Sequence, residues 1–295
     1  MKALSKTAVG QPLTKFGQTL YPLYSSEIPT DIRGGQRLSL QVSEVGGGTV
    51  GTLHVANAGE AFMLVPSGTV LKGGLQNRVV NSSVLIAAGE SYDVPVSCVQ
   101  QGRWSGQRNF EQGSSVAPRN VRRRMQETTI PRHDGYSRAD QGAVWAQVEM
   151  ALNERGARNQ TGDLTQIENS RVSDPRRAKI EKVAAGGPLP GQIGLAVMQG
   201  SRVVSIEMYA SSALLADHWD QLIRSIFDEP AGRVSGRASA DSVLRQLSKL
   251  SRTEWTRVPT VGIGQTHVAD DTNWSCRVLE TNGAIVHASM FALAG

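Results

Sequence analysis

The stretch that decides the fold is residues 79–99, VVNSSVLIAAGESYDVPVSCV, in which three short apolar runs are separated by turn-forming residues. The runs lie at 79–80, 84–86 and 92–99, and the last two are connected through Ala-Gly at 88–89. Short runs rich in β-branched residues and bounded by Gly, Asn and Ser are typical of β-strands. We therefore predict three consecutive strands here.

The same pattern extends towards the N-terminus. Residues 38–42 and 53–55 alternate between apolar and polar, and 61–65 is an apolar run that ends at a proline. Glycine-rich turns separate these segments, and no helix-period pattern interrupts them before residue 137. Short strands at regular spacing predict a β-sandwich-like domain over residues 15–104.

The C-terminal part alternates between helical and strand patterns. We expect a helix that Ser137 caps, with a second over 175–184 and a third over 239–250. The strongest amphipathic pattern places Leu215, Trp219, Leu222, Ile223, Ile226 and Phe227 on one helical face. Strands are expected on both sides of these helices, so residues 137–293 read as an α+β domain and the whole chain as α+β.

An arginine-rich segment, residues 105–136, connects the two predicted domains and shows no convincing secondary structure. The chain has a net charge of +5 at pH 7. Between Arg103 and Arg138, eight arginines and three acidic residues give the same +5, so this segment carries the whole excess. We favour a solvated loop as its interpretation.

Two alternatives remain open for Arg119 and Arg122 to Arg124 in this segment. The arginines could bind phosphates of a nucleic acid, although no aromatic residues are interleaved with them to stack on bases. They could instead pair with acidic residues of the C-terminal half, of which Glu207, Asp217 and Asp220 are examples. Such a clamp would fix the two halves relative to each other.

The composition is that of a folded globular chain: hydrophobic residues are 39% of the 295 residues and charged residues 19%. These values exclude a disordered chain, a coiled coil and a collagen-like repeat. No apolar run approaches the roughly 18 residues that a membrane span needs, so no membrane association is expected. The first residues lack the apolar stretch of a signal peptide, and the sequence therefore predicts a cytoplasmic protein.

Cysteine and histidine usage indicates neither a disulfide framework nor a metal site. The chain has two cysteines, Cys98 and Cys276, and its histidines show none of the spacings of metal-binding motifs. We expect no metal and no cofactor. Cys98 lies in an apolar, strand-like run, where a cysteine is typically a small core residue. The alternative is a reactive thiol, with Arg103 close in sequence.

The polar residues Gln-Asn-Arg at 76–78 closely follow the paired glycines at 73–74, and Gly-Arg-Trp lies downstream at 102–104. Two amides and a guanidinium in succession can bind a planar polar ligand or an anion, and a guanidinium with an indole suits a ligand that has both a phosphate and a flat ring. The alternative is that the amides tie a turn. The candidate ligand-binding residues are Lys72, Gln76, Asn77, Arg78, Arg103 and Trp104.

Four blocks of sequence stand out together: GGLQNR at 73–78, AGESYDVPVSC at 88–98, GRW at 102–104 and DQGAVW at 140–145. In these blocks and their spacing the chain resembles the ARPP family, whose name refers to association with ADP-ribosylglycohydrolases and rhodanese/phosphatase-superfamily proteins. The segment PGQIGL that begins at Pro190 also fits.

The resemblance covers most of the chain, about residues 15–293, and implies a bacterial protein with a link to ADP-ribose or other phosphate-bearing signals. It rests on association between genes and not on an activity. The chain also departs from the family pattern. A basic residue usually precedes the Gln of the first block, whereas Leu75 stands there in this chain, with Lys72 and Arg78 as substitutes.

Three hypotheses for function follow. The first is a cytoplasmic ligand-binding or accessory protein linked to ADP-ribose or nucleotide phosphates. The second is an enzyme acting on an ADP-ribose- or nucleotide-type substrate, with Asp140 as a catalytic base near Gln76 and Arg78. The third is a structural module that assembles as a homo-oligomer. The arrangement of Gln76, Arg78, Trp104 and Asp140 in the fold is the observation that separates them best.

Overall fold

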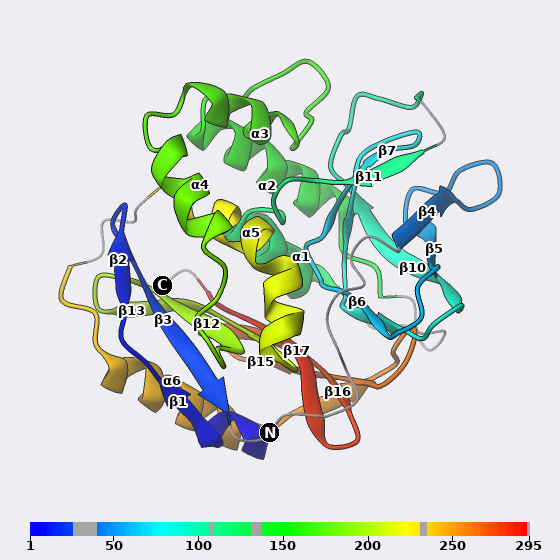
Figure 1. The fold of residues 1–295 in the computed structure, drawn as a ribbon. Helices are drawn as coiled ribbons and strands as arrows, with labels where there is room; N and C mark the ends of the chain where they lie inside the picture. The colour runs from blue at the N-terminus through cyan, green and yellow to red at the C-terminus, as the bar shows by residue number, and fades with distance from the viewer. Residues whose placement is uncertain (26–39, 107–108, 131–136, 231–234, 294–295) are drawn as a thin grey trace.

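The computed structural model describes residues 1–25, 40–106, 109–130, 137–230 and 235–293. Within these ranges the chain forms antiparallel sheets and helices (Figure 1), which confirms the predicted α+β class with a strand-rich N-terminal half. The larger sheet has nine strands among the described residues, in the order β1-β3-β12-β13-β17-β16-β15-β14, and β2 pairs with β3. Its strands are β1 (Thr7–Val9), β2 (Leu13–Lys15), β3 (Gln18–Ser25), β12 (Gly194–Gln199), β13 (Arg202–Tyr209), β14 (Thr256–Val258), β15 (Gln265–Asp270), β16 (Trp274–Thr281) and β17 (Ala284–Ala292).

The smaller sheet has six strands in the described part of the chain, in the order β11-β7-β8-β10-β5-β4, and β6 pairs with β9 beside it. The three strands predicted within residues 79–99 are present as β8, β9 and β10. The strands are β4 (Leu40–Glu44), β5 (Thr52–Asn57), β6 (Met63–Val65), β7 (Val70–Gly73), β8 (Arg78–Val80), β9 (Val84–Ile86), β10 (Ser91–Cys98) and β11 (Phe110–Gln112).

The N-terminal strands belong to the larger sheet and not to the smaller one. β3 pairs antiparallel with β12, so that Leu23 lies opposite Gly194. A strand from the first 25 residues therefore completes a sheet whose other strands lie mostly after residue 190. Sequence patterns do not reveal this pairing, because it joins segments far apart in the chain.

Helices cover both faces of the larger sheet (Figure 1). The helices α4 (Arg177–Ala185) and α5 (Ser212–Asp228) pack against one face. The helix α6 (Ala240–Arg252) and the 3-10 helix η1 (Lys2–Lys6) pack against the other. No helix among the described residues is both long enough and apolar enough to cross a membrane.

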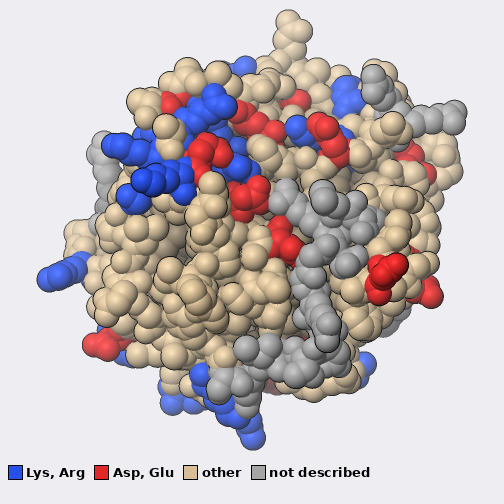
Figure 2. Space-filling model, viewed as in Figure 1, with Lys and Arg blue, Asp and Glu red and all other residues tan. Residues whose placement is uncertain are grey.

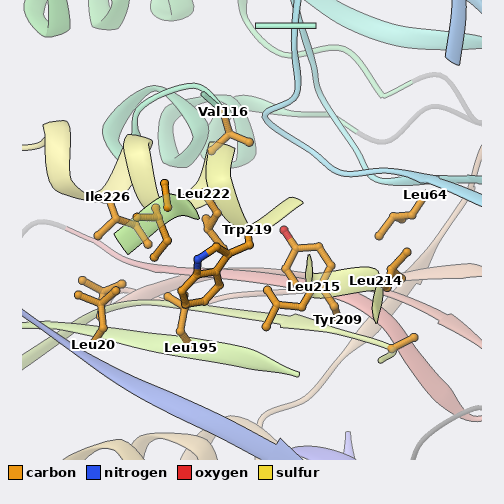
Figure 3. Packing of buried hydrophobic residues seen from close by; sticks show 14 of the residues in the cluster. Leu20, Leu64, Val116, Leu195, Tyr209, Leu214, Leu215, Trp219, Leu222 and Ile226 are labelled. Atoms are coloured by element: carbon orange, nitrogen blue, oxygen red, sulfur yellow. The ribbon is translucent and has the colours of Figure 1, made fainter. Parts of the chain in front are cut away.

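The predicted amphipathic face corresponds to α5. The side chains of all six predicted apolar residues are buried, and the Ser211 side chain caps the helix by accepting a hydrogen bond from the Leu214 backbone N–H. In Figure 3 the indole of Trp219 points from α5 towards Leu195 and Leu20 of the sheet. This burial of a continuous apolar stripe is what fixes α5 on the sheet.

The interpretation of residues 105–136 as a solvated loop is wrong for the part that the structure describes. This segment contains β11 and the helix α1 (Arg119–Thr128), whereas residues 107–108 and 131–136 lie outside the described residues. Val121 and Met125, one helical turn apart, are buried, and so are Arg122 and Gln126. The run of arginines concealed this short apolar stripe in the sequence.

The remaining helices are α2 (Gln141–Glu154), α3 (Gln166–Ser170) and the 3-10 segment η3 (Arg171–Ser173). The helix predicted to be capped by Ser137 begins later, because Asp140 provides the cap instead. Aspartate accepts hydrogen bonds from the free N–H groups of a first turn as well as serine does.

Basic residues on the surface are mixed with acidic ones. Figure 2 shows a group of Lys and Arg over α4 with Asp and Glu among them. One such ion pair joins Arg224 of α5 to Glu181 of α4 at 2.9 Å. The described residues of this face therefore form no uninterrupted basic stripe of the kind that a nucleic-acid backbone needs.

Candidate functional site

Arg78, at the start of β8, is the most unusual of the predicted site residues. Its side chain has no exposed surface, and its Nε–H donates a hydrogen bond to the Val50 carbonyl at 3.1 Å. Neither Nη1 nor Nη2 has a hydrogen-bond partner among the described residues. Burial lowers the pKa of Arg78 below its ordinary value. A buried guanidinium with two unpartnered nitrogens is costly, so it marks a place where an anion could bind.

Trp104 and Glu44 flank this guanidinium. The Trp104 ring lies over Arg78, with its centroid 6.0 Å from Cζ, and the residue is 50% exposed. Glu44 accepts a hydrogen bond from the Leu75 backbone N–H at 2.8 Å through Oε1, while its buried Oε2 has no hydrogen-bond partner in the described structure. The Glu44 carboxylate and the Arg103 guanidinium both act electrostatically on Arg78. Glu44 was missed in the sequence because it lies at the end of an otherwise ordinary strand.

Asn77 and Arg103 hold the turn before β8. The Asn77 Oδ1 accepts hydrogen bonds from the Gly73 N–H at 2.9 Å and from Arg103 Nη2 at 3.1 Å. Arg103 also donates to the carbonyls of Gly73 and Gly74, at 3.0 and 2.8 Å, and to Gln100 Oε1 at 2.6 Å. Their polar groups are thus engaged within the protein, as the turn-tying alternative predicts.

Gln76 and Lys72 are engaged as well. Gln76 donates through Nε2 to the Gln100 carbonyl at 3.1 Å, although its buried Oε1 has no partner among the described residues. Lys72 Nζ lies 3.2 Å from both Glu111 and Glu168. Burial acts to lower the pKa of Lys72, but the two carboxylates raise it above its ordinary value. Lys72 is therefore a charged partner of these acids and does not replace the basic residue missing at position 75.

Asp140 has a structural role at the start of α2. Its Oδ1 accepts hydrogen bonds from the backbone N–H groups of Gly142 and Ala143, at 2.9 and 3.1 Å. The next residue, Gln141, bonds to both the N–H and the carbonyl of Cys98, which pairs with Arg78 in the sheet. α2 is thus fastened beside β10, and Oδ1 of Asp140 caps the helix.

Cys98 is buried in β10 with no exposed surface. Its Sγ accepts a hydrogen bond from the Gln100 N–H at 3.4 Å. A buried thiol in an apolar strand is typical of a core cysteine, so the geometry favours the core interpretation. His267 lies 3.8 Å from Glu280, and the described residues contain no cluster that could hold a metal ion.

A groove of about 780 Å³ lies apart from these residues. Strands β4, β7 and β11 line one side and helices α4 and α5 the other, with Phe110 and Trp219 among the apolar side chains. None of the predicted ligand-binding residues lines it. The sequence offered no signal for this groove, because its two walls are formed by segments far apart in the chain.

The clamp alternative for the arginines of α1 is the one that agrees with the structure. Arg122 Nη1 lies 2.6 Å from Glu207 Oε1 of β13, with both side chains buried, and Arg119 lies 3.0 Å from Glu229. Asp220, another of the acids considered, pairs instead with Arg224 at 2.8 Å. α1 is therefore tied to the larger sheet by a buried charge pair.

Glu207 gives the protein a defined response to acid. Burial acts to raise the pKa of Glu207, but Arg122 and His287 hold it below its ordinary value of 4.5. A carboxylate whose pKa falls on folding stabilises the native state above its unfolded pKa, and that stabilisation is lost as the pH drops through the native pKa.

The difference in unfolding free energy between the wild type and Glu207→Gln should therefore be largest above about pH 4.5 and shrink at lower pH. Urea unfolding curves at a series of pH values measure it. Glu149→Gln is the control, because its side chain is 67% exposed. If the difference in unfolding free energy between the wild type and Glu207→Gln stays constant with pH, the carboxylate makes no such contribution.

Comparison of the chain with family models matches residues 7–291 to ARPP-1, described as the ARG and Rhodanese-Phosphatase-superfamily-associated Protein domain. The chain belongs to the ARPP-1 family. The match runs from the first strand of this ARPP-1 protein into its last, so the smaller and larger sheets both lie within the family's domain. No curated protein and no solved structure matches the chain.

The family description places the ARPP-1 domain in association with ADP-ribosylglycohydrolase and rhodanese/phosphatase superfamilies. This agrees in a general way with an accessory role near ADP-ribose chemistry, and it names no activity. Around this turn of the ARPP-1 protein, the buried polar atoms without a hydrogen-bond partner in the described structure belong to Arg78, Glu44 and Gln76.

Proposed function

We propose that this ARPP-1 protein binds a phosphate-bearing ligand with a flat ring, of the ADP-ribose or nucleotide class, at Arg78 and Trp104. The observation that carries the proposal is the buried Arg78 guanidinium, whose two Nη atoms lack partners among the described residues beneath a half-exposed indole. A guanidinium offers two parallel donors that match two phosphate oxygens.

The other groups at the site fit the rest of such a ligand. An exposed indole face stacks on a purine or similar ring. The unpartnered Oε2 of Glu44 can accept a hydrogen bond from a ribose hydroxyl or an exocyclic amine. Since Arg78 has no exposed surface, the ligand reaches the guanidinium only if covering groups move, and we propose that the Trp104 side chain, which lies over it, turns away.

The test is isothermal titration calorimetry with ADP-ribose, ADP, ribose 5-phosphate and inorganic phosphate. Arg78→Lys keeps the positive charge but removes the paired donors, so we expect it to weaken ADP-ribose binding by about tenfold or more. Arg158→Ala is the matched control, because the Arg158 side chain is 72% exposed and pairs with Glu149.

The thermal melting temperature of each variant is measured alongside. Weaker binding by Arg78→Lys at nearly unchanged melting temperature supports the proposal. Equal binding by Arg78→Lys and the wild type would contradict it, as would a wild type that binds none of the four compounds.

The two alternatives have less support. For an enzyme that uses Asp140 as a base, Oδ1 of this carboxylate already accepts two backbone hydrogen bonds, and only Oδ2 is left to take a proton. For an assembly module, the large apolar side chains exposed among the described residues, such as Ile130, Val172 and Leu189, come from separate segments. Turnover of an ADP-ribose conjugate that Asp140→Asn abolishes would favour the first alternative, and a large oligomer in light scattering the second.

A further inference from the structure

A serine, a histidine and a glutamate from three distant segments form one chain of contacts at the junction of the two sheets. Ser83 precedes β9, Glu207 lies in β13 and His287 lies in β17. The Ser83 Oγ is 2.7 Å from His287 Nδ1, and His287 Nε2 is 3.3 Å from Glu207 Oε2. His287 and Glu207 are 1% and 2% exposed, whereas Ser83 is only half-buried.

The charges fix the direction of the hydrogen bonds in this chain. Arg122 and His287 lower the pKa of Glu207 against the effect of burial, so the carboxylate is ionised and can only accept. The proton of a neutral His287 therefore belongs on Nε2, which faces Glu207. Nδ1 then carries a lone pair and accepts the hydroxyl proton of Ser83.

Other contacts hold the serine and the imidazole in place. The Ser67 backbone N–H donates a hydrogen bond to Ser83 Oγ at 3.0 Å. The Tyr209 ring packs edge-on against the His287 ring, with centroids 4.8 Å apart. Ser83 is thus the most exposed of the three residues, and His287 and Glu207 are buried deeper in the protein.

A purely structural role explains this arrangement poorly. Both Glu207 oxygens and His287 Nε2 lack an aligned hydrogen bond in the described structure, although they lie at ion-pair distance from their partners. A buried polar network that is only partly satisfied stabilises a junction less well than apolar packing does. Catalytic hydrogen bonds, by contrast, are often poorly aligned until a substrate is bound.

We propose that Ser83 is a nucleophile, with His287 as its general base and Glu207 as the residue that positions the imidazole and compensates its charge. The substrate class is a carboxylic ester. Ser83 Oγ forms a bond to the carbonyl carbon while its proton passes to His287 Nδ1. That proton then leaves with the alkoxide as the ester bond breaks. Water, deprotonated by His287, then bonds to the acyl carbon; the bond to Ser83 Oγ breaks, and His287 returns the proton to Oγ as the acid is released. The inference is independent of ligand binding at Arg78.

A fluorophosphonate probe tests the nucleophile directly, because serine displaces its fluoride and gains a fixed mass. We expect intact-mass spectrometry and peptide mapping to find the probe on Ser83. Ser83→Ala should abolish labelling, whereas Ser82→Ala, which changes the adjacent half-buried serine, should label as the wild type does. His287→Asn should label about 100-fold more slowly.

The pH profile of labelling separates a relay from a structural contact. Glu207→Gln should change this profile, since a neutral amide replaces the carboxylate beside the general base, whereas Glu149→Gln, at an exposed position, should leave it unchanged. Absence of the probe from Ser83 would overturn the proposal. Labelling of a folded His287→Asn at the wild-type rate would overturn it too, as would a pH profile of labelling that a folded Glu207→Gln leaves unchanged.

Discussion

Replacing Arg122 with alanine should lower the free energy of unfolding by about 3–5 kcal/mol. Arg122 of α1 and Glu207 of β13 form a pair in which the side chains are 6% and 2% exposed. Removing the cation leaves a buried carboxylate whose remaining ion-pair partner among the described residues is His287. The guanidinium also lies over the Phe291 ring, 4.9 Å from its centroid, so some packing is lost as well.

Arg123→Ala is the matched control from the same helix. Arg123 pairs with Glu127 one turn away at 3.3 Å, with both side chains 23% exposed. Such pairs contribute about 0.3–0.5 kcal/mol. Urea unfolding of the two variants measures the difference. Similar losses of unfolding free energy for Arg122→Ala and Arg123→Ala would contradict the clamp. They would mean that the Arg122–Glu207 pair does not hold α1 on the larger sheet.

Phe227→Ala should cost a comparable amount, about 3–5 kcal/mol. Phe227 ends the apolar stripe of α5, has no exposed surface and meets the Phe16 ring edge-on at a centroid distance of 5.3 Å. Its truncation leaves a cavity between the helix and the sheet, which the surrounding rigid elements cannot close.

Leu244→Ala in α6 is the control, because Leu244 is 42% exposed and its truncation should change stability by about 0.5 kcal/mol or less. Urea unfolding again provides the comparison. A Phe227→Ala loss as small as that of the control would mean that α5 is not held on the sheet by this stripe.

The elements that sequence patterns predicted correctly are those whose signal is local. The apolar stripe of α5 and the pattern that predicted α6 lie within single segments, and the strands of residues 79–99 are bounded by their own turns. Periodicity and capping report directly on which face is buried, so no knowledge of distant residues is needed.

The helix α1 was missed because its stability depends on a residue far away. Only Val121 and Met125 mark its apolar side, and a buried Arg122 becomes acceptable because Glu207 lies opposite it in the fold. Composition alone makes such a segment look solvated. The pairing of β3 with β12 was hidden for the same reason.

The same difference between local signals and contacts of distant residues holds for the candidate sites. The motif around Arg78 predicted a site at the turn before β8, yet Asn77 and Arg103 hold that turn, and only the contacts separate these two residues from Arg78. Ser83, Glu207 and His287 have no characteristic spacing, so no motif could find them. Their relation exists only once the two sheets are packed together.

The measurement that most directly tests ligand binding at Arg78 is nuclear magnetic resonance of the indole N–H groups. The chain has five tryptophans, so labelling them with nitrogen-15 gives few signals, and Trp104→Phe assigns the one of interest. During titration with ADP-ribose we expect the Trp104 signal to shift saturably and the signal of the buried Trp274 to stay in place. In Arg78→Lys the shift should require much more ligand. A Trp104 signal that ADP-ribose does not move, or that moves equally in Arg78→Lys, would contradict the account.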